Sequence, residues 1–431
     1  MAKYTIEERI ACVTILATLP LYFIGALYLV GPILGWLLIA LVALRVLLLD
    51  EVSLPPLAIV WFGGALLLLL ALFIAHANYD LGIAQTIKSS IGWAKGWALF
   101  ALFLTAGLTL NIDPTRIAHA VAWLSATIVP FALLSFAFVP LMSGYLYTSP
   151  LSIVGGAGTE YFEVRLFGIN PETGLPRWPF FAPWAPAAGL LGCLFFAITW
   201  HAPQSRIRWI GLVGATLMVL MCQSRVGWLT LPVVFCLLQV SRFNLHRFQL
   251  LPIAAIATVA LLASPEIFDT AQSITTDIKN SRPDSTRVRA ALEQTALDRW
   301  AQEAPIWGHG TVERGPHLVQ YMPIGTHHTW LGLLFIKGAV GVLAFATMLL
   351  SLLYAVGIAI VKREVPISSL AVVLPLFVYT LTENLEMLVY LYWPALVFIG
   401  AALKQGLPIQ QSIKTLTTAR TNRAQGNEYA I

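Results

Sequence analysis

The chain has 431 residues, of which 58% are hydrophobic and only 11% are charged, and its formal net charge is +5. Soluble domains carry about a quarter charged residues, so this composition excludes a soluble globular enzyme. The apolar runs are long and continuous, which favours an all-α polytopic membrane protein over a β-barrel with alternating strands. Because the basic residues lie in short loops between these runs, the charge indicates membrane topology and no nucleic-acid partner.

The apolar runs predict about twelve transmembrane helices in a single membrane domain, residues 1–404. Thr5 and Glu8 have the spacing of a capping box. No small-residue cleavage site follows the first apolar run, so we expect a retained first span and no cleaved signal peptide. Residues 78–95 are expected to form an interfacial helix, and the polar tail 405–431 to be cytoplasmic and disordered. The predicted spans cover residues 10–29, 32–49, 55–75, 91–111, 117–139, 186–200, 207–223, 226–241, 249–264, 339–361, 366–382 and 386–404.

The loop charges predict which side of the membrane each loop faces. If the N-terminus, with Lys3 and Arg9, is cytoplasmic, nearly every loop after an even-numbered span is short and basic, as the positive-inside rule requires. Both termini are then cytoplasmic. The loop 140–185, the corner Ser224–Arg225 and the long loop 265–338 fall together on the opposite side, which predicts a single active face outside the cytoplasm.

A polar segment with helical periodicity lies inside the long loop. In residues 285–303, apolar side chains recur every four positions, which predicts an amphipathic helix on the membrane surface, a lid over the spans. Arg287 and Arg289 flank this stripe on opposite sides, so at most one is expected to face a buried site, and Arg287 is favoured. The stripe consists of Val288, Leu292, Ala296 and Trp300.

Arginines near the span ends are candidates for binding an anion. A guanidinium is always charged and forks onto phosphate, so Arg225 is either an anion clamp or an arginine that snorkels to lipid head groups. Arg165 and Arg177 in loop 140–185 are similar candidates, with ordinary surface arginines as the alternative. The chain has no Asp-x-Asp pair, Walker loop, GxSxG elbow or HExxH helix, so arginines would have to neutralise a diphosphate substrate.

Two adjacent histidines, His327 and His328, stand where the long loop returns to the membrane. Histidine can act as a general base near neutral pH, and the alternative is a pair of interfacial histidines that cap a helix. A zinc site with His309 and His317 is a third interpretation. Their spacing matches no zinc pattern, so we expect neither a metal nor a cofactor.

In this order, the segments resemble the O-antigen ligase and polymerase superfamily of membrane glycosyltransferases. The family pattern is an arginine followed by P-[IL]-x-G-x-G, H-[NS]-x-x-L and G-x-x-G. The corresponding residues here are Arg287, Pro305–Gly310, His327–Leu331 and Gly338–Gly341, and the segments Gln223–Arg225 and Arg165–Gly168 are also similar to the family.

The resemblance implies a glycan donor on polyprenyl (undecaprenyl) diphosphate at the periplasmic face of the bacterial inner membrane. The glycan passes to an acceptor hydroxyl with inversion, without a metal or a nucleotide sugar. Arg225 and Arg287 are implied to hold the diphosphate, and His327 to deprotonate or orient the acceptor. Residues implied to help bind the substrates are Arg165, Arg289, His328 and His309.

Several functions stay open within and beyond the superfamily. A ligase, ranked marginally first, would move a finished glycan to lipid A-core. A polymerase would join repeat units of O-antigen, capsule or exopolysaccharide, and a protein glycosyltransferase would use Ser or Thr. A transporter of the same lipids would need intramembrane charges, for which Arg45 and the Glu383/Glu386 pair are modest candidates, and the sequence shows no internal repeats or discontinuous helices.

Overall fold

The computed structural model describes residues 5–47, 54–156, 158–170, 173–240, 283–317, 322–324 and 328–405. The predicted span 249–264, the tail 406–431 and His327 lie outside the described residues. Arg287 and Arg289 lie within a described helix, but their side chains do not belong to the described part.

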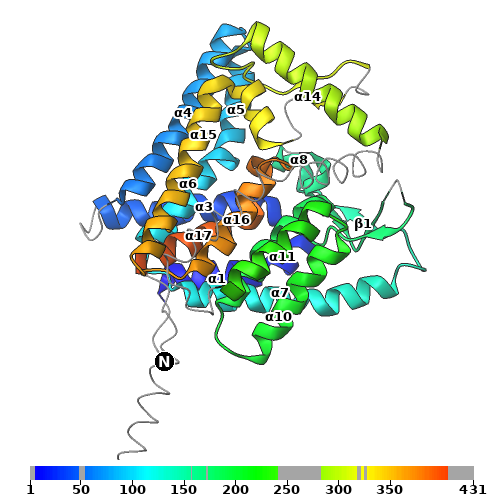
Figure 1. Cartoon of the computed structure of the whole chain (residues 1–431). Coiled ribbons are helices and arrows are strands. Elements are labelled where there is room, and N and C mark those ends of the chain that lie inside the picture. The colour runs from blue at the N-terminus through cyan, green and yellow to red at the C-terminus, as the bar shows by residue number, and fades with distance from the viewer. Residues whose placement is uncertain are drawn as a thin grey trace, which may run out of the picture.

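The described residues are mostly helical, as predicted (Figure 1). The α-helices are α1 (Ile6–Leu16), α2 (Thr18–Ile24), α3 (Leu27–Leu47), α4 (Pro56–Asn78), α5 (Gly82–Lys95), α6 (Trp97–Thr109), α7 (Pro114–Ala137), α8 (Ser152–Gly155), α9 (Ala185–Trp200), α10 (Arg206–Met221), α11 (Arg225–Val240), α14 (Pro283–Glu303), α15 (Thr329–Val361), α16 (Leu370–Tyr379) and α17 (Val389–Gln405). Short 3-10 helices are η1 (Thr159–Tyr161), η4 (Ile367–Ser369) and η5 (Leu385–Leu388).

Within the described ranges, 6 helical segments are long and apolar enough to cross a membrane. They begin at Leu27, Pro56, Gly82, Pro114, Thr329 and Leu385. Three further apolar helices, Ala185–Trp200, Arg225–Val240 and Ile367–Tyr379, are shorter. The structure therefore supports a multi-pass membrane protein, and the predicted count of twelve spans is not confirmed.

Several boundaries differ from those predicted. The expected first span, 10–29, is divided because α2 ends at Gly25 in a left-handed conformation. The expected span 339–361 begins ten residues earlier, at Thr329, because the chain is already helical before Gly338. That helix has non-helical dihedral angles at Gly338, so the expectation of no discontinuous helix is wrong.

The polar loops also contain short strands that the sequence pattern did not predict. Three antiparallel two-stranded ladders occur in the described residues. They pair β1 (Tyr145–Thr148) with β2 (Glu163–Arg165), β3 (Gly168–Ile169) with β4 (Pro176–Arg177), and β5 (Glu313–Arg314) with β6 (Pro323–Ile324). Strands of two to four residues are too short to produce a clear alternating pattern in the sequence.

The centre of the helical bundle is formed by α6 and α17. Every residue of α6 is buried, and so are Val389–Ala402 of α17. A Cβ on Gly107 would lie 2.4 Å from the carbonyl oxygen of Val397, and one on Gly400 would lie 2.5 Å from that of Leu104. Small residues thus let the two backbones touch, as they do in membrane helix pairs.

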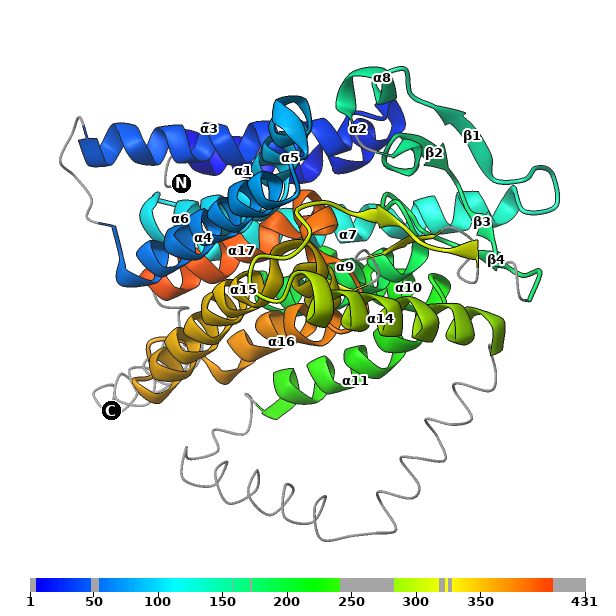
Figure 2. The same ribbon diagram turned by 90° about the horizontal axis from the view of Figure 1, so that it is seen from above.

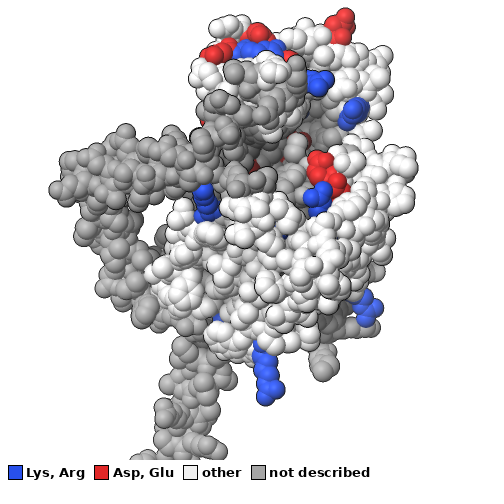
Figure 3. Space-filling view, turned by 90° about the vertical axis from the view of Figure 1, so that its right-hand side faces the viewer, with Lys and Arg blue, Asp and Glu red and all other residues white. Residues whose placement is uncertain are grey.

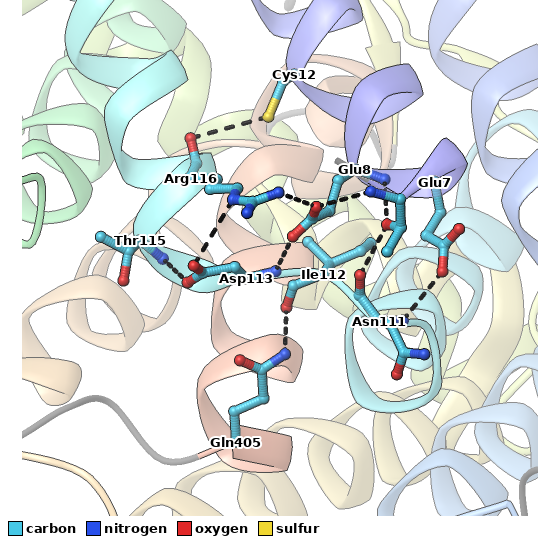
Figure 4. A network of polar contacts seen from close by, with 10 residues as sticks. Glu7, Glu8, Cys12, Asn111, Ile112, Asp113, Thr115, Arg116 and Gln405 are labelled. Atoms are coloured by element: carbon cyan, nitrogen blue, oxygen red, sulfur yellow. Dashed lines mark hydrogen bonds and ion pairs between the residues drawn. The ribbon is translucent and has the colours of Figure 1, made fainter. Parts of the chain in front are cut away.

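A polar network, here called the polar clamp, joins the starts of α1 and α7 to the end of α17 (Figure 4). The predicted capping box of Thr5 and Glu8 is confirmed. Glu8 is only 4% exposed and accepts hydrogen bonds from the Arg116 guanidinium and the Asp113 N–H. Gln405 donates to the Ile112 carbonyl at 2.8 Å. The first and last described helices therefore meet on one side of the bundle.

One further ion pair and two hydrogen bonds extend the polar clamp. Buried Glu7 pairs with Arg45 at 2.7 Å, and the Lys404 ammonium donates to the Thr109 and Leu110 carbonyls. Since α6 and α17 both end here, the first residues of α6 and the segment before α17 lie at the opposite end of the bundle.

Replacing Glu8 with alanine is expected to destabilise the protein by about 1–3 kcal/mol, because Asp113 N–H and Arg116 lose their buried acceptor. The lower part of the range applies if water reaches the Arg116 side chain, which is 21% exposed. Thermal unfolding in detergent, followed by tryptophan fluorescence, measures this. Glu364→Ala, at an exposed position, is the matched control. Equal melting temperatures of the two variants would contradict a stabilising role for the clamp.

Candidate active site

The motif Pro305–Gly310 folds against the break in α15. Phe335 and Ile336 accept backbone hydrogen bonds from the N–H groups of His309 (2.8 Å) and Gly310 (2.9 Å). Beyond the break, the Ala339 N–H donates to the Pro305 carbonyl at 3.0 Å, and Val340 donates to Ile306. We call the segment Pro305–Gly310 the clasp. Its hydrogen bonds satisfy backbone N–H and C=O groups that a broken helix would otherwise leave without hydrogen-bond partners.

Glycines are required where the clasp meets the helix. Gly338 has φ +64° and ψ −164°, a region that residues with a side chain avoid, and a Cβ there would lie 2.2 Å from the Ile306 carbonyl oxygen. Gly308 also has a positive φ, and its Cβ would lie 2.4 Å from the Ile336 carbonyl carbon. The spacing of the motif glycines is thereby explained by backbone packing.

The buried side chain of His309 holds the clasp against α15. Its ring is 1% exposed and stacks on Phe335 with centroids 4.2 Å apart. Nδ1 lies 3.1 Å from the Phe335 carbonyl oxygen and Nε2 lies 2.8 Å from a Glu303 carboxylate oxygen. The Gly310 carbonyl lies 3.1 Å from Nε2 of buried His76 on α4. Both His309 nitrogens are therefore used within the protein.

The predicted amphipathic helix is confirmed as α14, which lies across the bundle and packs against α15 (Figures 1 and 2). Leu292 and Ala296 of the predicted stripe are buried, with Ile324 and Phe335 beside them. Arg299 pairs with Glu303 and Glu313. The hydrogen bonds from Arg299 lower the pKa of Glu303 to about 2, so this carboxylate stays ionised beside His309.

The first turn of α15 is held by its capping residue and by the turn before η5. His328 is the N-cap, and its Nδ1 accepts from the Leu331 N–H at 3.3 Å. Burial lowers the pKa of His328, which favours the neutral ring that this bond requires. The Thr329 hydroxyl donates to the Glu383 carbonyl at 2.8 Å and accepts from the Leu385 N–H. For His328, the capping interpretation is the one observed.

Arg225 is the first residue of α11 and follows a constrained turn. Gln223 has φ +52°, which is uncommon for a residue with a side chain. Its side chain accepts from Asn170 at 3.1 Å and donates to the Pro176 carbonyl at 2.9 Å. The Ser224 hydroxyl accepts from the Gly227 N–H. The loop 140–185 is thus attached to the corner Ser224–Arg225, as their predicted common face requires.

Arg165 ends β2 and forms an ion pair with Glu163. Its guanidinium lies 5.8 Å from the centre of the Tyr145 ring. The Tyr22 hydroxyl donates to the Arg165 carbonyl and accepts from its N–H, both at 2.7 Å. The backbone at Arg165 is therefore firmly held, while its side chain is 42% exposed.

A cavity of about 530 Å³ opens where the two predicted loops meet. It is bounded by the clasp at Gly310, the start of α15 at Thr329, and residues 158–161 of the other loop. It also reaches the α5–α6 junction and η5, so it lies at the opposite end of α6 and α17 from the polar clamp. The volume is in the usual range of small-molecule sites, about 300–1,000 Å³.

On the face shared by α14 and β1, acidic and basic side chains gather beside a hollow (Figure 3).

The described lining of the cavity carries two lysines and two glutamates, Lys95, Lys337, Glu160 and Glu386. None of these was predicted as a catalytic or substrate-binding residue, and Glu386 was named only as a modest candidate for a transport path. The available signal was Lys337, a charge within an otherwise apolar run, because such charges are costly and usually functional. Arg225 and Arg165 are not among the described lining residues, and neither are His309 and His328.

In the described residues, no group of three or more His, Cys, Asp or Glu side chains could hold a metal ion. The fold and the cavity define a multi-pass membrane protein with a polar site at one end of its helices.

Residues 210–346 match a protein family described as O-antigen ligase. The matched segment includes Arg225, the clasp, α14 and the first half of α15. It confirms the resemblance to the O-antigen ligase and polymerase superfamily of membrane glycosyltransferases. No curated protein matches the chain.

Proposed function

We propose that the protein is a metal-independent, inverting glycosyltransferase that uses a glycan on polyprenyl diphosphate. The acceptor oxygen attacks the anomeric carbon of the donor, the bond from that carbon to the diphosphate oxygen breaks, and the carrier diphosphate leaves. The observation that carries this proposal is the cavity bounded by the family's clasp motif and by the turn that begins α15.

The leaving diphosphate needs positive charge, and the proposal assigns this to Arg225 and Arg287. Arginine pairs bidentately with phosphate and stays charged at any physiological pH. Two hydrogen bonds of the Gln223 side chain hold the turn before Arg225. This supports the role of Arg225, because a preorganised charge needs little reorganisation during the reaction. Arg165 and Arg289 remain proposed substrate-binding residues.

We propose His327 as the base that takes the proton of the acceptor hydroxyl. It stands two residues before Thr329, which lines the cavity. His328 and His309 were also predicted to bind substrate. Their observed contacts favour a supporting role, in which His328 caps α15 and His309 holds the clasp.

The proposed orientation places the polar clamp in the cytoplasm and the cavity at the periplasmic face of the bacterial inner membrane. Support comes from the basic residues of the clamp, Arg45, Arg116 and Lys404, since cytoplasmic loops of membrane proteins are enriched in Lys and Arg. The cavity, at the other end of α6 and α17, then faces the periplasm.

Ligase activity toward lipid A-core is proposed first, with polymerisation of repeat units as the alternative. The test is the glycolipid profile of a deletion strain. Long polymer on the polyprenyl carrier, with bare lipid A-core, is expected for a ligase, and single repeat units on the carrier for a polymerase. Intermediates trapped at the cytoplasmic face would contradict transfer and favour a lipid-glycan transporter.

A further inference from the structure

The walls of the cavity combine aromatic rings with a charged pair inside the helical bundle. Lys337, the residue before the α15 break, is 4% exposed and lines the same cavity as Glu386 of η5. The two side chains carry opposite charges when both are ionised. Trp97 lines the same cavity. A Cβ on Gly96 would lie 2.5 Å from the Glu386 Cγ, so the missing side chain there makes room for this carboxylate.

Two opposite charges buried in this position are weak evidence for a stabilising role. Replacing a buried ion pair with packed apolar side chains is often neutral or stabilising, because desolvation offsets the attraction. Ionisable groups among membrane helices usually mark a substrate path or site. The pair also lines an open cavity, where its oxygens and its ammonium can reach a ligand.

The other residues that line the cavity are suited to bind a ring that has one apolar face, such as a sugar. Trp93, Trp97, Tyr161 and Trp184 contribute aromatic side chains, and Asn384 contributes an amide. Aromatic rings offer flat apolar contact area, on which the C–H face of a sugar can lie. Carboxylate, ammonium and amide groups match the donors and acceptors of sugar hydroxyls.

The charges of the described lining argue against a diphosphate in this cavity. The ammonium groups of Lys95 and Lys337 are offset by the carboxylates of Glu160 and Glu386. Lys95 already donates to the Gly155 carbonyl at 2.7 Å. A site for a diphosphate needs an excess of positive charge, whereas hydroxyl groups are bound by balanced donors and acceptors.

We propose that Lys337 and Glu386 form a saccharide subsite, which binds a sugar ring of the transferred or accepting glycan against Trp97. Glu386 accepts hydrogen bonds from sugar hydroxyl groups, and Lys337 donates to sugar oxygens. The proposal rests on the proposed function for the class of ligand. It makes the pair a determinant of which glycan is used.

The test measures binding of the glycan itself, without transfer. The surface glycan of the producing strain, released from its carrier by mild acid, is titrated onto the full chain in nanodiscs, and saturation-transfer NMR reports binding. Glu386→Gln and Lys337→Met are expected to weaken binding at least about tenfold. Lys362→Met, at the exposed residue that follows α15, is the matched control and is expected to bind as the wild type does.

Equal affinity of Glu386→Gln, Lys337→Met and the control would overturn the proposal. So would binding of inorganic pyrophosphate that depends on Lys337, since the cavity would then hold the diphosphate. If a variant does not fold, the wild-type protein is tested instead. Its melting temperature must rise with glycan concentration, because a ligand that binds the folded state stabilises it. The two proposals can fail separately. If the protein binds the glycan but its deletion leaves the surface glycans unchanged, the proposed function is contradicted and the saccharide subsite is not.

Discussion

Arg225→Ala lowers kcat/KM for a lipid-diphosphate donor by about 10²–10³, because one preorganised charge on the leaving group is lost. Arg225→Lys is expected to fall between this variant and the wild type, since an ammonium retains the charge but not the bidentate geometry. The measurement is release of the polyprenyl diphosphate carrier by purified protein in lipid vesicles, with donor and acceptor supplied.

The matched control for Arg225 is Arg206→Ala, which removes an exposed arginine at the other end of α10. This control is expected to keep the wild-type rate. An Arg225→Ala rate within about threefold of the control would remove Arg225 from the proposed diphosphate site, because charge stabilisation of a leaving group has a far larger effect.

Gly338→Ala is expected to abolish turnover in protein that still inserts into the membrane. A Cβ at this position would lie 2.2 Å from the Ile306 carbonyl and 2.6 Å from the Gly308 nitrogen, so the clasp must open. Backbone strain alone costs about 1–3 kcal/mol at such dihedral angles. The predicted observations are a lower melting temperature and loss of transfer.

Gly357→Ala is a matched change in the same helix, since a Cβ there meets nothing within 4 Å. It is expected to melt and turn over like the wild type. If Gly338→Ala behaves in the same way as Gly357→Ala, the clasp has no part in forming the site.

The sequence predicted the helical membrane fold because apolar runs determine it almost directly. Helix α14, the capping box and the common position of the two polar loops followed from periodicity, cap residues and loop charge. The start of α15 did not, because Gly338 resembles a turn when its neighbours in space are unknown. Its dihedral angles are accommodated by residues 305–310, about thirty positions earlier in the chain.

The candidate site was predicted only in part. The motif pointed to the segments around Gly310 and Thr329, and both border the cavity. Glu386 was named as a charge near a span end, but its place in the same cavity as Lys337 depends on how η5 lies beside the start of α15. Such contacts between distant segments leave no periodic pattern in a single sequence. His309 resembled a ligand-binding residue because its contacts with Glu303 and Phe335 were not visible in the motif.

The most direct measurement is the glycolipid profile of a deletion strain complemented with His327→Ala. We expect glycan to accumulate on its polyprenyl diphosphate carrier and surface polymer to be lost, as in the uncomplemented strain. Wild-type complementation should restore the normal profile by gel and mass spectrometry. A normal profile with His327→Ala at wild-type protein levels would contradict transfer by a histidine base at this site.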